Sequence, residues 1–173
     1  MAKTPVHSRI VLIGFPGSGK TTIGKKLAKM LNYEFVDLDK WFETKYHISI
    51  TDFFNKYGET PFRVSEHQLL TEVLLLEHVV ISTGGGTPCF HGNMDLILAH
   101  SCSVYIKMAP VSLFDRLIHS KKKRPLILNK SDDEVLAYVH EKLDEREKYY
   151  NQATHTIKGE SLCMDDLVLL VKN

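Results

Sequence analysis

The feature that most constrains this chain is a glycine-rich segment, Gly14 to Thr21, which fits the pattern G-x-x-x-x-G-K-[ST] over its full length. Four apolar residues, 10–13, predict a buried strand before it, and the periodicity of 20–31 predicts a helix after it. In this context the backbone N–H groups of the turn and the helix N-terminus can surround a phosphate. Lys20 is suited to the outer phosphates, and the Thr21 hydroxyl to Mg²⁺. The predicted nucleotide-binding residues here are Pro16, Gly17, Ser18, Gly19, Lys20, Thr21 and Thr22.

Short apolar runs alternate with longer periodic segments along the rest of the chain. Runs at 34–38, 79–82, 104–108 and 154–158 predict four more strands, and none shows the polar alternation of a half-exposed strand. This pattern predicts an α/β/α fold with a parallel sheet of about five strands, covered by helices on both faces. A length of 173 residues corresponds to about one domain, 1–173.

Local signals mark the ends of several predicted helices. Ser49 is expected to cap a short helix that runs through residue 56 and is closed by Gly58. Pro61 is expected at the first position of the next helix, which opens at Thr60–Pro61. Ser131, with Glu134 three residues later, predicts a capping box and a helix that continues to about 151.

The balance of charge and the cysteine content exclude several function classes. The formal net charge is +1, so the chain has no general basic field with which to hold a nucleic acid. Three cysteines without a C-x-x-C pair indicate free thiols in a reducing compartment. No signal peptide and no apolar stretch long enough to cross a bilayer is recognisable. We expect a cytoplasmic monomer with no membrane partner.

Two acids, Asp37 and Asp39, end the second predicted strand. Strand alternation predicts that both side chains point the same way at the carboxyl edge of the sheet, where open α/β sheets bind ligands. One carboxylate is suited to holding Mg²⁺ through water, and the other to orienting or deprotonating a hydroxyl. The alternative is that these acids only cap the following helix.

Two arginines and a triple glycine are candidates for contacts to an anionic substrate. Arg63 and Arg146 each share a predicted helical face with apolar residues, which suggests a carboxylate or phosphate partner. Internal ion pairs of Arg63 with Glu59 or Glu66 are the alternative. The three glycines 84–86 end the third strand and allow a ligand to lie against bare backbone, unless they are only a flexible turn. The glycines are Gly84, Gly85 and Gly86.

A basic segment, Ser120 to Pro125, separates two predicted helices. Its three lysines are typical of a solvated charge run. Arg124, next to proline, is the better candidate for a lid over 119–130 that brings positive charge to the γ-phosphate.

Other nucleotide-binding classes fit the sequence less well. A GTPase switch needs a D-x-x-G segment, and the chain has none. The sequence Asn129-Lys130-Ser131-Asp132 matches the guanine-reading pattern N-K-x-D, but its last residues are better explained as a helix start. A nucleotide-binding module without catalysis stays as a further alternative.

Taken together, these motifs resemble the shikimate kinase family from about residue 9 to about residue 150. The resemblance comprises the P-loop, the D-x-D pair, Gly58-Glu59-Thr60-Pro61-Phe62-Arg63, the triple glycine, Arg124-Pro125-Leu126 and Arg146 four residues before Tyr150. The segment at 58–63 matches G-E-x-x-F-R of the family and is far more specific than the P-loop alone.

The resemblance implies transfer of the ATP γ-phosphoryl group to the 3-hydroxyl of shikimate, with Mg²⁺ as cofactor. It implies that Asp39 holds ring hydroxyls and acts as base, that Arg63, Arg146 and Gly85 hold the substrate, and that Lys20 and Arg124 neutralise the phosphoryl group. It also implies that Thr21 ligates Mg²⁺ with Asp37 behind it, and that Arg116 lies beside the adenine. The segments 158–161 and 87–91 depart from the family pattern. Another small-substrate or nucleoside-monophosphate kinase of the same fold is the closest rival.

Overall fold

A computed structural model of the chain describes residues 7–120, 127 and 129–172. It contains a five-stranded sheet in the order β2-β3-β1-β4-β5, in which every neighbouring pair is parallel. The predicted α/β fold is confirmed, and the strand bounds move by one or two residues from those expected. The strands are β1 (Arg9–Ile13), β2 (Glu34–Asp37), β3 (Val79–Ser82), β4 (Cys102–Lys107) and β5 (His155–Lys158).

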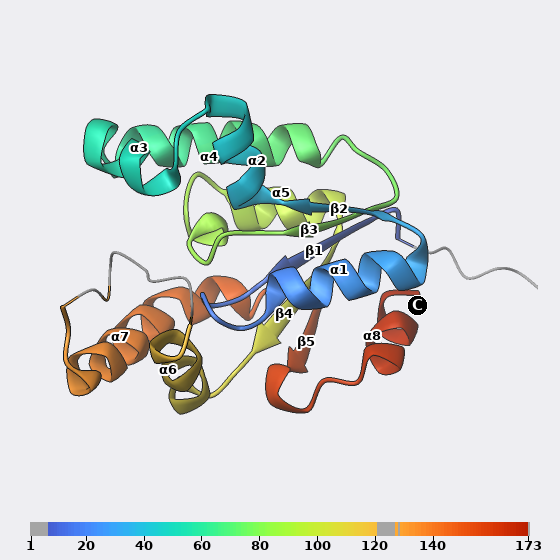
Figure 1. Ribbon diagram of the computed structural model, residues 1–173. Helices are drawn as coiled ribbons and strands as arrows, with labels where there is room; N and C mark the ends of the chain where they lie inside the picture. The colour runs from blue at the N-terminus through green and yellow to red at the C-terminus, as the bar shows by residue number, and fades with distance from the viewer. Residues whose placement is uncertain (1–6, 121–126, 128, 173) are drawn as a thin grey trace, which may run out of the picture.

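Helices lie over both faces of the sheet (Figure 1), and the central strands β3, β1 and β4 are almost entirely buried, which explains why they lack polar alternation. In the edge strand β5, half-buried and exposed residues alternate, so the expectation of no alternation is wrong there. Within β1, Val11 and Ile13 pack into one core cluster while Ile10 and Leu12 pack into the other, and all four are fully buried. Helices α1 and α8 supply the second cluster, and α2 to α7 supply the first. The helices are α1 (Lys20–Leu31), α2 (Leu38–Tyr46), α3 (Ile50–Tyr57), α4 (Glu59–Val73), α5 (Asn93–His100), α6 (Pro110–Ile118), α7 (Asp132–Tyr150) and α8 (Met164–Lys172), with short 3₁₀ turns η1 (Thr87–Cys89) and η3 (Gly159–Ser161).

Capping residues begin the helices largely as the sequence predicts. The Ser49 hydroxyl accepts from the Asp52 N–H at 3.0 Å at the start of α3. Ser131 and Glu134 form the complete capping box of α7, with N···O distances of 2.7 and 3.3 Å. The expectation for Pro61 is wrong, because α4 begins two residues earlier, at Glu59. Gly58, at φ 83° and ψ 179°, turns the chain directly from α3 into α4, so the first turn of α4 starts before the proline.

The capping box at Ser131 also removes the guanine-reading interpretation of Asn129 to Asp132. Ser131 is the N-cap of α7 and Asp132 is its first residue, so the four residues form a helix start. Across the described residues, no helix combines the length and apolarity needed to cross a bilayer.

Candidate active site

The P-loop joins β1 to α1 and leaves the start of α1 open to an anion. Gly17 and Gly19 have φ values of 91° and 94°, a region that L-residues rarely adopt, so the turn depends on glycine at both positions. Gly19 is the N-cap of α1, and no side chain caps it. The first turn of the helix therefore presents N–H groups and a favourable dipole to a phosphate.

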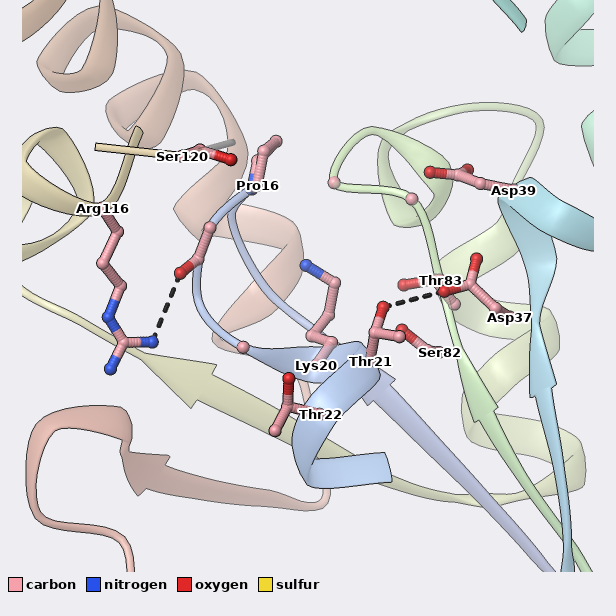
Figure 2. A pocket seen from close by; sticks show the side chains of 14 residues that line it. Pro16, Lys20, Thr21, Thr22, Asp37, Asp39, Ser82, Thr83, Arg116 and Ser120 are labelled. Atoms are coloured by element: carbon pink, nitrogen blue, oxygen red, sulfur yellow. Dashed lines mark hydrogen bonds between the residues drawn. The ribbon is translucent and has the colours of Figure 1, made fainter. Parts of the chain in front are cut away.

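A cavity of about 290 Å³ lies over this turn, at the carboxyl ends of the central strands. Figure 2 shows its wall built from the P-loop, the segment after β2, the segment after β3, and Arg116. Ser18 is fully buried beneath the turn. The other predicted nucleotide-site residues that the structure describes all line this cavity. Its lining is Pro16, Gly17, Gly19, Lys20, Thr21, Thr22, Asp37, Asp39, Ser82, Thr83, Gly84, Gly85, Arg116 and Ser120.

The Lys20 ammonium group folds back over the P-loop. Its Nζ donates to the carbonyl oxygens of Gly14 and Phe15 at 2.8 and 3.0 Å and lies 3.5 Å from the Ser18 hydroxyl. The residue is 7% exposed, so this charge sits at the floor of the cavity. A phosphate above the turn would meet a positive charge that is already held in place.

Thr21 and Asp37 form the pair of hard oxygens that a magnesium ion needs. The Thr21 hydroxyl donates to Asp37 Oδ2 at 2.8 Å, and Figure 2 shows the pair at the side of the cavity. Within the described part of the chain, no group of three or more histidine, cysteine or carboxylate side chains is suited to enclose a metal ion. This donor set suits Mg²⁺, which usually keeps several waters and binds proteins through one or two oxygen ligands together with substrate phosphates.

Asp39 lines the cavity at the edge of the sheet as predicted, but it lies in a helix and not at the end of a strand. β2 ends at Asp37, whose side chain accepts from the Lys40 N–H at 3.3 Å and so caps α2, and Asp39 lies in the first turn of that helix. Leu38 and Phe42, spaced four apart and both buried, turn this segment into a helix that packs on the core. Both carboxylates nevertheless line the P-loop cavity, so Asp37 caps α2 and lines the cavity at the same time.

The triple glycine is required for close packing of site groups. A Cβ on Gly85 would lie 2.4 Å from Pro16 Cδ, and one on Gly84 would lie 2.9 Å from Asp39 Oδ1. A Cβ on Gly86 would lie 2.6 Å from Arg63 Nη2. The three glycines thus let three chain segments converge at the end of β3, and Gly86 itself lies beside Arg63 and outside the P-loop cavity lining.

Arg63 and Arg146 meet in a second cavity of about 500 Å³. It lies between the start of α4, the segment from η1 to Phe90 and the last turns of α7. The structure thus brings together two arginines that the family resemblance assigns to one substrate. The lining residues are Phe54, Glu59, Arg63, Cys89, Phe90, Tyr138, Lys142, Glu145, Arg146, Lys148 and Tyr149.

Two carboxylates bind Arg63, so the predicted alternative of internal ion pairs is also correct. Glu59 Oε1 accepts from both Nε and Nη2 at 3.1 Å, and Glu66 Oε2 accepts from Nη1 at 2.9 Å. The guanidinium Cζ lies 5.1 Å from the Phe62 ring centroid and 4.2 Å from that of Phe90. Arg63 therefore both lines the cavity and is held by its own helix.

Arg146 connects the second cavity with the P-loop. Its Cζ lies 5.5 Å from the ring centroid of Phe15, a P-loop residue. One turn later the Tyr150 hydroxyl donates to the Gly85 carbonyl, which fixes the end of α7 against the glycine segment. Gly85 lies against Pro16, and both residues line the P-loop cavity, so the end of α7 is tied to the wall of that cavity.

Cys89 lies in the second cavity between the two arginines. Burial raises the pKa of its thiol to about 11, against the opposing effect of Arg146 and Arg63. The sequence analysis did not assign residues 87–91, and Phe90 and Cys89 are the cavity residues it missed there. All three cysteines are free thiols, as predicted.

Arg116 lies beside the P-loop at the end of α6. Its Nη1 donates to the Gly17 carbonyl at 3.4 Å. Glu160, in the segment that departs from the family pattern, accepts from the Ala109 N–H at 2.7 Å and so caps α6 from a distant part of the chain. Glu160 is exposed, and the hydrogen bond from the Ala109 N–H lowers the pKa of its carboxyl group. Arg124 and most of the predicted lid lie outside the described residues.

Comparisons with known proteins agree on one family. The family model described as shikimate kinase matches residues 16–168. A shikimate kinase of Azobacteroides pseudotrichonymphae is 45% identical over 161 residues, which are 92% of this chain and 95% of the relative. The crystal structure of shikimate kinase from Bacteroides thetaiotaomicron has a TM-score of 0.90 at 37% identity and covers 96% of this chain and 97% of its own. A shikimate kinase from Acinetobacter baumannii, solved in complex with shikimate, has a TM-score of 0.82 at 30% identity, with 95% and 90% covered.

Proposed function

Because this chain belongs to the shikimate kinase family, and is therefore a phosphoryl-transferring kinase, we propose that its P-loop cavity and its second cavity bring ATP and shikimate together. The observation that carries this proposal is the convergence of Arg63 and Arg146, from helices 83 positions apart, beside the P-loop. A small acid gripped there would point its ring hydroxyls toward the phosphate cavity.

ATP is proposed to bind with its phosphates over the P-loop. The backbone N–H groups of 17–22 and the α1 dipole would surround the β-phosphate, and Lys20 would exchange its bonds to P-loop carbonyls for bonds to the outer phosphates. Arg116 is proposed to flank the adenine. The choice of ATP as the nucleotide follows from the family. The position of Lys20 at the floor of the cavity supports the proposed exchange of its hydrogen bonds.

Magnesium is proposed to bind beside Thr21, with Asp37 contacting it through water. The short Thr21–Asp37 hydrogen bond supports this role, since it holds both oxygens at the edge of the phosphate site. When bound, the ion would neutralise charge on the β- and γ-phosphates. Asp37 would keep the Thr21 hydroxyl oriented toward the nucleotide.

Shikimate is proposed to occupy the space between the arginines and the P-loop cavity. Arg63 and Arg146 would bind its carboxylate, with Gly84, Gly85 and Gly86 offering close backbone approach. Asp39 would accept hydrogen bonds from the ring and take the proton of the attacking 3-hydroxyl, because it lies next to Gly84 on the wall facing Lys20. The sequence predicts a substrate-holding helical insert near residues 40–70, and helices α2 to α4, which span 38–73, would form this acceptor side.

The transfer itself would be accelerated by alignment and by positive charge, with no covalent intermediate on the protein. Lys20 and Arg124 are proposed to stabilise the γ-phosphoryl group as it moves. The single-domain organisation over 1–173, the lid over 119–130, a monomeric state and a cytoplasmic location stay as predictions.

An ADP-release assay tests the acceptor. With Mg-ATP, shikimate should support turnover, and gluconate, CMP and AMP should not. Turnover with a nucleoside monophosphate in place of shikimate would assign the chain to the rival kinase class. Binding of ATP with no acceptor-dependent release would assign it to the non-catalytic class.

A further inference from the structure

The guanidinium of Arg63 is accessible to an incoming carboxylate along one edge. The Phe62 and Phe90 rings lie beside it, and Gly86 lies directly against Nη1 and Nη2, where a Cβ would come within 2.9 and 2.6 Å. Glu66 occupies Nη1. The edge formed by Nε and Nη2 faces the second cavity, and Glu59 occupies it with both hydrogen bonds.

The two carboxylates on Arg63 differ in how firmly they are held. The Glu66 side chain is 4% exposed and also accepts from the Thr87 hydroxyl at 2.6 Å, so it cannot leave without losing a buried bond. The Glu59 side chain is 55% exposed and lines the cavity. Glu59 can therefore turn into solvent, where water replaces its bonds to Arg63, while Glu66 stays in place.

We infer that Glu59 acts as a stand-in carboxylate on Arg63, which an acidic acceptor must displace in order to bind. This inference rests on the proposed function, because it places the shikimate carboxylate on the same Nε–Nη2 edge. Binding is then an exchange of one carboxylate for another. The Nε and Nη2 groups of Arg63 then always keep a carboxylate partner, and the displaced Glu59 carboxylate moves to solvent.

Because of this exchange, Glu59 is expected to lower the affinity for the acceptor. Glu59 competes with the substrate carboxylate, so weakening its bond to Arg63 should tighten acceptor binding. A residue that merely supports the fold, or that orients Arg63 for the substrate, would weaken binding when changed. The change in acceptor affinity should match the contribution of an exposed ion pair, which corresponds to about a two- to fivefold change in Kd.

The experiment compares Glu59→Gln with Glu141→Gln in the full-length protein. Glu141 pairs with Lys142 at 3.6 Å, is 67% exposed and lines neither the second cavity nor the P-loop cavity, so this control removes an equal charge outside both sites. Steady-state kinetics would give KM for shikimate, KM for ATP and kcat. Calorimetric titration of shikimate into the ADP-bound protein would measure acceptor affinity independently of turnover.

For Glu59→Gln we expect a shikimate KM and Kd about two- to fivefold lower than wild type, with kcat and the ATP KM unchanged. Glu141→Gln should leave the shikimate constants within error. An unchanged or higher shikimate Kd in Glu59→Gln overturns the inference, and so does an equal gain in affinity in Glu141→Gln. If wild-type protein neither binds nor phosphorylates shikimate, the proposed function itself fails, and the inference fails with it.

Discussion

Replacing Gly86 by alanine is a direct test of the arginine cavity. The backbone there has φ −92° and ψ −14°, which alanine adopts without strain, so any cost must come from the added methyl group. That methyl would lie 2.6 Å from Arg63 Nη2, whereas ordinary contact begins near 3.4 Å. The guanidinium must therefore move by about 0.8 Å, and the Phe90 ring at 4.2 Å and the Glu66 bond at 2.9 Å oppose that movement.

A displacement of this size should act mainly on the acceptor. Misplacing a binding group by about 1 Å can lower a rate about 10²-fold, so we expect kcat/KM for shikimate to fall about ten- to a hundredfold. The ATP KM should stay the same, because Gly86 lies outside the P-loop cavity lining. Overpacking should also lower the free energy of unfolding by about 1–3 kcal/mol, measurable by urea titration.

Gly92→Ala is the matched control for Gly86→Ala. An added Cβ at Gly92 meets nothing within 4 Å, but φ is +68°, so the variant should lose stability of about 1–2 kcal/mol through backbone strain alone. Its shikimate kinetics should remain those of the wild type. If Gly86→Ala folds and keeps wild-type shikimate kinetics, then Arg63 is either not fixed as described or not an acceptor ligand.

One substitution, one alkylation experiment and one pH series test other parts of the site and the core. Asp39→Asn should lower kcat by on the order of 10²-fold if Asp39 takes the hydroxyl proton, and a kcat near wild type would remove it from proton transfer. Because burial raises the pKa of the Cys89 thiol to about 11, its alkylation by iodoacetamide should speed up about tenfold per pH unit from pH 8 to 10. Shikimate should slow alkylation of Cys89 and not of the exposed Cys163, as peptide mass spectrometry would show; equal labelling with and without shikimate would contradict the cavity assignment. Burial also raises the pKa values of Tyr105 and Tyr150 above the ordinary 10.0. The unfolded chain then loses protons that the folded chain keeps. Burial raises the pKa values of the Cys89 and Cys102 thiols from 9.0 to about 11, which acts in the same direction from a lower pH. The urea midpoint should therefore be steady from about pH 7 to 8 and fall as the pH rises above about 9, and a steady midpoint at pH 11 would refute this.

The sequence predicts best those features that depend on neighbouring residues. The P-loop, the capping box at Ser131 and the buried strand at 10–13 each follow from a few adjacent side chains, and the structure contains all three. A common substrate for Arg63 and Arg146 was implied by the family resemblance, since the helical face of each arginine does not by itself bring the two together. The structure places both in the lining of one cavity.

Features that depend on three-dimensional packing were harder to predict. Asp39 was assigned to a strand, although Leu38 and Phe42 at a spacing of four indicate the helix that the core selects. The two interpretations of Arg63, substrate contact and internal pairing, looked exclusive in sequence. The structure confirms the internal pairing, with buried Glu66 on Nη1 and exposed Glu59 on Nε and Nη2, and it also places Arg63 in the lining of the second cavity.

Because of the strand order, the segments of the candidate site come together only when the whole sheet has formed. The P-loop follows β1, Asp37 ends β2 and the glycine segment follows β3, yet β3 lies between the other two in the sheet. A partly folded chain that lacks β3 would leave the phosphate turn and the acids apart, with no place for either ligand. Nucleotide should therefore protect distant strands and helices from hydrogen exchange together, as expected when a ligand binds only the complete native state.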